Sequence, residues 1–334
     1  MPQTGGGESS KGKKRRLVYR LSPEPTGIAF SPLGCSPTGT GAPQGTVFQD
    51  KGTPKLTNVH VLLIFWGTQW AGNPNPLATQ VTNAVRNLLA GPYMSFLAQY
   101  GVRRGSLWGT LFFTSSDPPQ SFSYANVGSF IINQLDQDQL PEPDSDWPLF
   151  YCVIMPSNVS FQGDPRLETV PLPPGTLSKV VGANSSIIWN DYDLGDVDND
   201  PAHYAWVGSD GTVDYITTVL SHELVEACTD PNGGNGIVQV NPPCAGGACQ
   251  IGDPCTGICD FVRGVKVQSY WSQLGPWTGN GFSPNGACLV PKLYSVRRTL
   301  AGAGVRLGGK GLSSIEPPPP TPRVGLNTLI AGLF

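Results

Sequence analysis

The chain has few charged residues and little net charge. Lysine, arginine, aspartate and glutamate make up only 13% of its 334 residues, and the formal net charge is −3. Proteins that bind nucleic acid or an anionic membrane surface usually present an excess of positive charge. The composition excludes such a global field, so we expect no nucleic-acid partner.

Long apolar runs are also missing. The stretch at 59–66 is interrupted by His60 and is far shorter than the roughly 20 apolar residues that span a bilayer. Near the N-terminus, the basic cluster at 11–16 is followed by only three residues before Arg20, so no signal-peptide core follows it. We expect no membrane span.

Glycine and proline are plentiful, with 42 and 33 residues respectively. Residues 1–55 are rich in Gly, Pro, Ser and Thr, and residues 294–334 include four consecutive prolines at 317–320. Such segments bury little apolar surface and are typical of disordered tails. The sequence therefore predicts one domain at 56–293 between two tails, and we expect a monomer.

Strand and helix patterns alternate between the tails. Apolar runs predict strands at 59–66, 107–114, 149–155, 180–189 and 204–207. Apolar residues at three- and four-residue steps predict helices around 77–88, 93–100, 127–135 and 213–227. This alternation favours an α/β fold, with α+β as the alternative, in which helices flank one central mixed sheet. A loop-rich, cysteine-containing part follows residue 230.

The segment at 221–231, SHELVEACTDP, suggests metal chemistry. The chain has only three histidines and seven glutamates, yet His222 and Glu226 stand four positions apart here. On a helix both project from one face and can ligate one ion, while Glu223 beside them could take a proton from water. The alternative is a buried helix in which His222 and Glu226 simply pair with each other.

The surrounding pattern supports a helix at this motif. A core-facing stripe is formed by Val213, Ile216, Leu220, Leu224 and Ala227. His222 and Glu226 fall on the opposite side, which could line a cleft. Asp210 or Thr212 could cap the start of this helix, and Pro231 suits its end.

The motif is accompanied by other recognisable strings. These are residues 61–70 (VLLIFWGTQW), 250–255 (QIGDPC), 268–272 (QSYWS) and Cys288. Over about residues 57–291 the chain resembles a group of secreted, zinc-peptidase-like proteins that look distantly related to the plant Exordium and phosphate-induced proteins. The resemblance implies a metal-binding domain with a zincin-like active-site helix.

Zinc sites in enzymes usually take three protein ligands and one water. The resemblance favours Asp253, the aspartate of the Ile-Gly-Asp string, as the third ligand. The alternatives that stay open are His203, Asp214, Asp230 and Asp260. Gln250 stands where relatives often carry glutamate, which removes one potential ligand, and Asn232 stands where a metzincin has its third histidine.

The donor set bears on the choice of metal. Two carboxylates and one neutral imidazole cancel the charge of a divalent ion, which leaves a weaker Lewis acid than a site with two histidines. Zinc is the expected metal, with calcium, magnesium and manganese as competitors. The aspartates of the Asp191–Asp200 segment are compatible with calcium binding or with a plain acidic loop.

Most of the eight cysteines lie in the later part of the chain, at Cys228, Cys244, Cys249, Cys255, Cys259 and Cys288. Disulfides would hold this glycine- and proline-rich part together and predict secretion, with a cytoplasmic location as the alternative. The competing interpretation is a structural zinc site at Cys244, Cys249, Cys255 and Cys259, although their spacing lacks C-x-x-C pairs. Cys152 is expected to be a buried free thiol, and Cys35 lies in the predicted tail.

Two functions are compatible with these features. In the first, the chain is a zinc-dependent peptidase that acts on a protein or peptide substrate with Glu223 as the base. In the second, it is a non-catalytic extracellular binding or signalling module of Exordium-like type that retains a structural metal site. Such a module has no need of Glu223, so this residue favours the enzyme.

Overall fold

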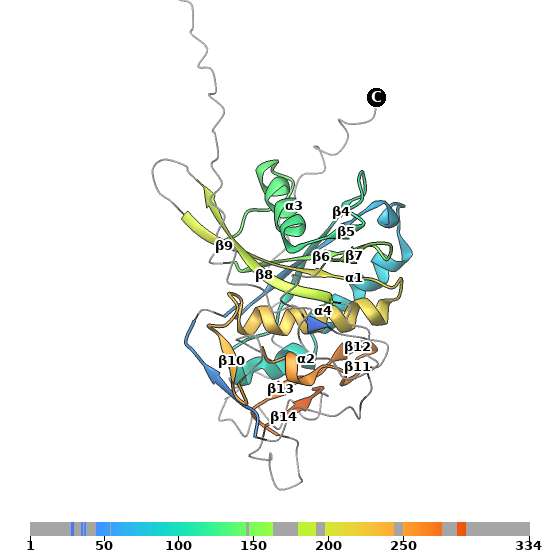
Figure 1. Cartoon of the computed structure of the whole chain (residues 1–334). Coiled ribbons are helices and arrows are strands. Elements are labelled where there is room, and N and C mark those ends of the chain that lie inside the picture. The colour runs from blue at the N-terminus through green and yellow to red at the C-terminus, as the bar shows by residue number, and fades with distance from the viewer. Residues whose placement is uncertain are drawn as a thin grey trace, which may run out of the picture.

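A computed structural model describes residues 28–29, 35, 37, 45–53, 55–144, 147–162, 180–191, 198–243, 250–275 and 286–291. A six-stranded sheet lies at its centre, with α3 on one face and α1 and α4 on the other (Figure 1). The strand order is β1-β8-β9-β6-β3-β4. The predicted α/β fold with a central mixed sheet is therefore confirmed.

The sheet combines a parallel half with an antiparallel half. Its strands are β1 (Ile28–Ala29), β3 (His60–Trp66), β4 (Ser106–Phe113), β6 (Leu149–Ile154), β8 (Val180–Asp191) and β9 (Asp198–Val207). β3 runs parallel to β4 and β6, and β6 runs parallel to β9, whereas β8 is antiparallel to β9 and to β1. The last predicted strand begins six residues early, because residues 198–203, which start with the polar string DND, continue the β8–β9 ladder.

Helices pack on both faces of the sheet and enclose an apolar core on each face. They are α1 (Pro76–Leu89), α2 (Pro92–Ser95), η3 (Phe96–Tyr100), α3 (Tyr124–Asp136) and α4 (Val213–Thr229), with the single turns η2 (Thr68–Trp70) and η4 (Asp253–Cys255). Within β3, Val61 and Leu63 pack with α1 and α4, whereas Leu62 and Ile64 pack with α3. Burial on both faces explains why β3 is apolar throughout and does not alternate.

The metal-motif helix α4 lies between the sheet and a further layer (Figure 1). Thr212 caps its start by accepting a hydrogen bond from the Tyr215 N–H, and the helix ends at Thr229, just before Pro231. Every residue from 216 to 229 is buried. The expectation that one side lines a cleft is therefore wrong for the described chain, because the segment after residue 250 folds back over that side.

This covering layer consists of short paired strands. They are β2 (Val47–Asp50), β10 (Ile237–Asn241), β11 (Cys259–Val262), β12 (Val265–Gln268), β13 (Tyr270–Ser272) and β14 (Ala287–Leu289), while β5 (Ser121–Phe122) and β7 (Ser160–Phe161) pair elsewhere. β12 packs directly on α4. Residues 47–50, which the sequence assigned to the N-terminal tail, pair with β10 and so belong to the folded part.

Two disulfides fasten the covering layer. Cys35 bonds Cys259 and Cys255 bonds Cys288, with Cα–Cα separations of 5.5 and 5.3 Å. Disulfides were predicted, but Cys35 had been placed in the tail, and no spacing rule could reveal a partner 224 residues away. The structural zinc interpretation is wrong for Cys255 and Cys259, since both are already bonded.

The other cysteines divide into two groups. Cys152 is buried and free, as predicted, and Cys228 is also buried and free rather than part of the disulfide cluster. Cys244 and Cys249 lie outside the described residues.

Within the part of the chain that the structure describes, no helix is long and apolar enough to cross a membrane.

The disulfide pairing predicts a measurable loss of stability. Replacing Cys288 by alanine should lower the free energy of unfolding by about 3 kcal/mol, because it releases a long loop in the unfolded chain. Non-reducing peptide mapping should recover the Cys35–Cys259 and Cys255–Cys288 bridges, with Cys152 alkylated only after unfolding. Alkylation of Cys255 and Cys259 without a reductant would contradict the pairing.

Candidate metal centre

Three predicted ligands converge beneath the covering layer. His222 Nε2 lies 3.1 Å from Glu226 Oε1 and 3.7 Å from Asp253 Oδ1. One ligand atom from each residue falls within 4.8 Å of the others, and this is the one group of potential metal ligands found among the described residues. Their side chains are 4%, 0% and 8% exposed. Helical spacing supplies two ligands, and η4 brings the third.

The two ligand carboxylates fit a divalent cation. Glu226 Oε1 and Asp253 Oδ1 are buried and accept no hydrogen bond from the described residues. Burial is the main cause that raises the pKa of Glu226 and of Asp253 well above the ordinary range, and other carboxylates nearby raise them further. Buried carboxylates at such close range either retain protons or surround a cation.

The backbone at Gly252 lies close against two of the ligand side chains. A Cβ added to Gly252 would lie 2.8 Å from both Glu226 Oε1 and His222 Nδ1, closer than real side chains approach. Only glycine therefore lets the loop that carries Asp253 approach α4 so closely. The glycine of the Ile-Gly-Asp string thus has a steric role next to the metal ligands.

Glu223 lies beside the ligands but faces β8. Its Oε2 accepts a 3.3 Å hydrogen bond from Asn184 Nδ2, which also lies 3.1 Å from Glu226 Oε2 and 3.4 Å from Gln250 Oε1. A Cβ on Gly182 would come within 2.5 Å of Glu223 Oε1, so β8 makes room for this carboxylate. Burial raises the pKa of Glu223 to about 7, and His222 partly offsets that rise.

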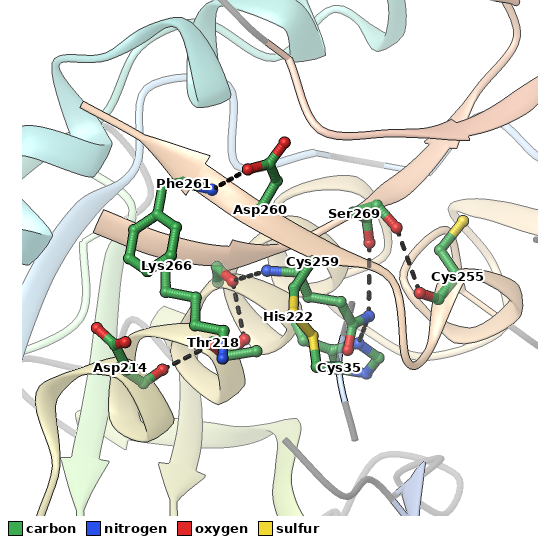
Figure 2. The surroundings of a disulfide bond; sticks show 12 residues. Cys35, Asp214, Thr218, His222, Cys255, Cys259, Asp260, Phe261, Lys266 and Ser269 are labelled. Atoms are coloured by element: carbon green, nitrogen blue, oxygen red, sulfur yellow. Dashed lines mark hydrogen bonds between the residues drawn. A yellow bond between two sulfur atoms is a disulfide. The ribbon is translucent and has the colours of Figure 1, made fainter. Parts of the chain in front are cut away.

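His222 is held from its other ring nitrogen by a residue that the sequence reasoning did not single out. Gln268 Nε2 lies 2.5 Å from His222 Nδ1 and donates a 3.0 Å hydrogen bond to Gly252 O. Figure 2 shows the Cys35–Cys259 disulfide and Ser269 around His222. In β11 and β12, Cys259 pairs directly with Gln268. The signal was present in the string QSYWS, whose first residue is Gln268.

The four alternative third ligands lie elsewhere. Burial lowers the pKa of His203 to about 4, which keeps it neutral near Pro231. Asp230 accepts hydrogen bonds from three backbone N–H groups in the turn at 234–236, which closes the chain after α4. Asp214 and Asp260 also do not join the three converging atoms. Among the described residues, Asp253 is the candidate that the fold brings into position.

The predicted calcium segment lies partly outside the described residues. Asp191 ends β8, Asp198 and Asp200 lie in β9, and Asp191 pairs with Asp198 across the two strands. Asp193 and Asp196 lie outside the described residues, as do the side chains of the other three. Calcium binding at Asp191–Asp200 stays a prediction.

No protein-family model, curated protein or solved structure matches the chain. The similarity to secreted zinc-peptidase-like and Exordium-like proteins therefore stays a prediction from short strings. The functional argument rests on the geometry of the buried side chains.

Asp253 can be tested as the third ligand against a matched aspartate. Asp253→Asn should weaken zinc binding more than the roughly 10- to 100-fold that residues outside the ligand set typically contribute. Asp260→Asn, in the same covering layer, should leave the affinity unchanged. Competition with a chromophoric chelator measures both constants, and equal affinities in the two variants would exclude Asp253 as a ligand.

The buried carboxylates also predict a pH dependence. The pKa of Glu223, about 7 in the folded chain against an ordinary 4.5, means that folding favours its protonated form. Its contribution to stability is therefore complete below about pH 4.5 and is lost as pH rises towards 7. A bound cation opposes that loss, so the gap in melting temperature between zinc-loaded and zinc-free protein should widen from about pH 5 to pH 8. A constant gap would argue against a metal among these carboxylates.

Proposed function

We propose that this chain is a zinc-dependent peptidase in which His222, Glu226 and Asp253 hold the metal and Glu223 is the base. The observation that carries the proposal is the placement of Glu223. It shares the Asn184 amide with ligand Glu226, yet it is not one of the three converging ligand atoms. Metal-assisted hydrolysis requires a further acidic or basic side chain that does not bind the metal but lies next to its ligands.

In this proposal, three residues of the chain bind the metal and a fourth, Glu223, transfers protons. Zinc, when bound, supplies Lewis acidity that polarises a peptide carbonyl and lowers the pKa of water. Glu223 accepts the proton of the attacking water and passes it to the leaving amine. Burial raises the pKa of Glu223 above its ordinary value, which makes the carboxylate a stronger base towards water. Asn184 keeps its carboxylate oriented.

The ligand set makes the proposed enzyme a modest one. Two carboxylates neutralise the charge of a divalent ion, so the metal depresses the pKa of water less than it does beside two histidines. We therefore expect slow hydrolysis with an optimum shifted towards alkaline pH. The two disulfides of the covering layer are compatible with an extracellular location and with protein or peptide substrates there.

Burial favours a second candidate, a binding module with a structural metal. His222, Glu223 and Glu226 are at most 3% exposed in the described chain. A peptide would reach Glu223 only if the covering layer or β8 moved. A metal that serves only to fasten α4 to η4 needs no such access.

A matched pair of glutamate variants separates the two candidates. Glu223→Gln should retain zinc and lose about 10²- to 10⁴-fold in the hydrolysis of an unfolded protein substrate, because a base typically contributes that much. Glu142→Gln, at an exposed glutamate, should match the wild type. If zinc-loaded wild type and Glu223→Gln are equally inert on broad peptide libraries, the binding module replaces the peptidase.

A further inference from the structure

The hydrogen bonds around Gln268 determine which ring nitrogen of His222 carries its proton. Gly252 O, at 3.0 Å, is a carbonyl and can only accept, so the amide nitrogen of Gln268 must face it. The same amide nitrogen lies 2.5 Å from His222 Nδ1 and 3.5 Å from Ser269 O. Nδ1 therefore accepts, and the proton of the neutral ring lies on Nε2.

This tautomer suits the protein without a metal. With its proton on Nε2, the ring places this N–H 3.1 Å from Glu226 Oε1, in the position that a cation would otherwise occupy. A metal needs the lone pair of Nε2, so the ring proton must then lie on Nδ1 and be donated to an acceptor. The Oε1 of Gln268 is such an acceptor: it is buried and takes no hydrogen bond from the described residues.

We propose that Gln268 is a positioning residue whose side-chain amide turns over when metal binds. This inference rests on the proposed metal site. In the turned state, Oε1 accepts from His222 Nδ1–H, Nε2 of the ring faces the metal, and Gly252 O loses the Gln268 donor and keeps the Cys255 N–H. The amide thus stabilises the metal-free state through Gly252, the neighbour of ligand Asp253, and limits the affinity of the site.

The backbone of Gln268 is held by hydrogen bonds, so only its side-chain amide can rotate when metal binds. Its backbone N–H donates to Ser221 Oγ at 2.9 Å, and its carbonyl accepts from the Tyr93 hydroxyl at 2.8 Å. The residue is fully buried in β12 against α4. Ser221 immediately precedes His222, so the ring and the amide are held at a set distance.

Replacing the amide by a carboxylate tests the proposal by the direction of the effect. A carboxylate accepts but does not donate, so Gln268→Glu should fix the metal-binding tautomer and tighten zinc binding about tenfold, whereas Gln268→Leu should weaken it about tenfold. The control is Gln99→Glu, which adds the same charge at a residue that contacts the Ser272 hydroxyl and the Gln273 N–H and no predicted ligand. It should tighten binding much less than Gln268→Glu.

Competition with a chelator gives the affinities, and nitrogen-15 NMR of the zinc-free wild type gives the tautomer. We expect His222 to be protonated on Nε2; protonation on Nδ1 would overturn the proposal without any variant. If the wild type binds zinc and Gln268→Glu binds it with the same or a lower affinity, the proposed role of Gln268 is wrong and the metal site stands. The same holds if both glutamate variants bind zinc more tightly by the same factor. Absence of zinc binding in every protein would overturn the metal site and this inference with it.

Discussion

Three carboxylic acids and one imidazole are buried together between α4 and the layer that covers it, and this burial constrains the rest of the site. Glu226 is fully buried, Glu223 and His222 are 2% and 3% exposed, and the Asp253 side chain is 8% exposed. A charge in the protein interior is strongly unfavourable unless it is paired, hydrogen-bonded or bound to a metal. A divalent cation bound there would neutralise two of the carboxylates, and the third, that of Glu223, accepts a hydrogen bond from Asn184.

Two layers enclose the buried side chains, the central sheet and the covering layer, and they are stabilised in different ways. The sheet supplies β8, whose Gly182 and Asn184 accommodate Glu223, and it forms through long-range apolar packing. The covering layer supplies Asp253 and Gln268 from short strands and a single turn. Short strands bury little apolar surface, so the layer depends on the Cys35–Cys259 and Cys255–Cys288 disulfides. The site therefore lies between a sheet that is stabilised by apolar packing and a covering layer that is stabilised by disulfides.

The sequence predicted the elements whose signals are local. The helix spacing of His222 and Glu226 and the buried strands followed from periodicity, because each pattern reports one element. The cap at Thr212 was one of two candidates, with Asp210 as the other. The burial of the ligand side of α4 did not follow, since its cover comes from residues 250–272. The roles of Cys35 and Gln268 were not predicted for the same reason, because they depend on partners that only the fold brings close. Asp253 was identified through a similarity of strings, and the structure places it at the ligands.

Anomalous X-ray diffraction at the zinc edge, from crystals grown with one equivalent of zinc, tests the central claim most directly. A zinc ion held by His222, Glu226 and Asp253 should give one dominant peak at about 2.0–2.2 Å from a nitrogen of the first and a carboxylate oxygen of each of the others. A peak elsewhere, or no peak between these residues at full zinc occupancy, would contradict it and leave a proton-sharing cluster in its place.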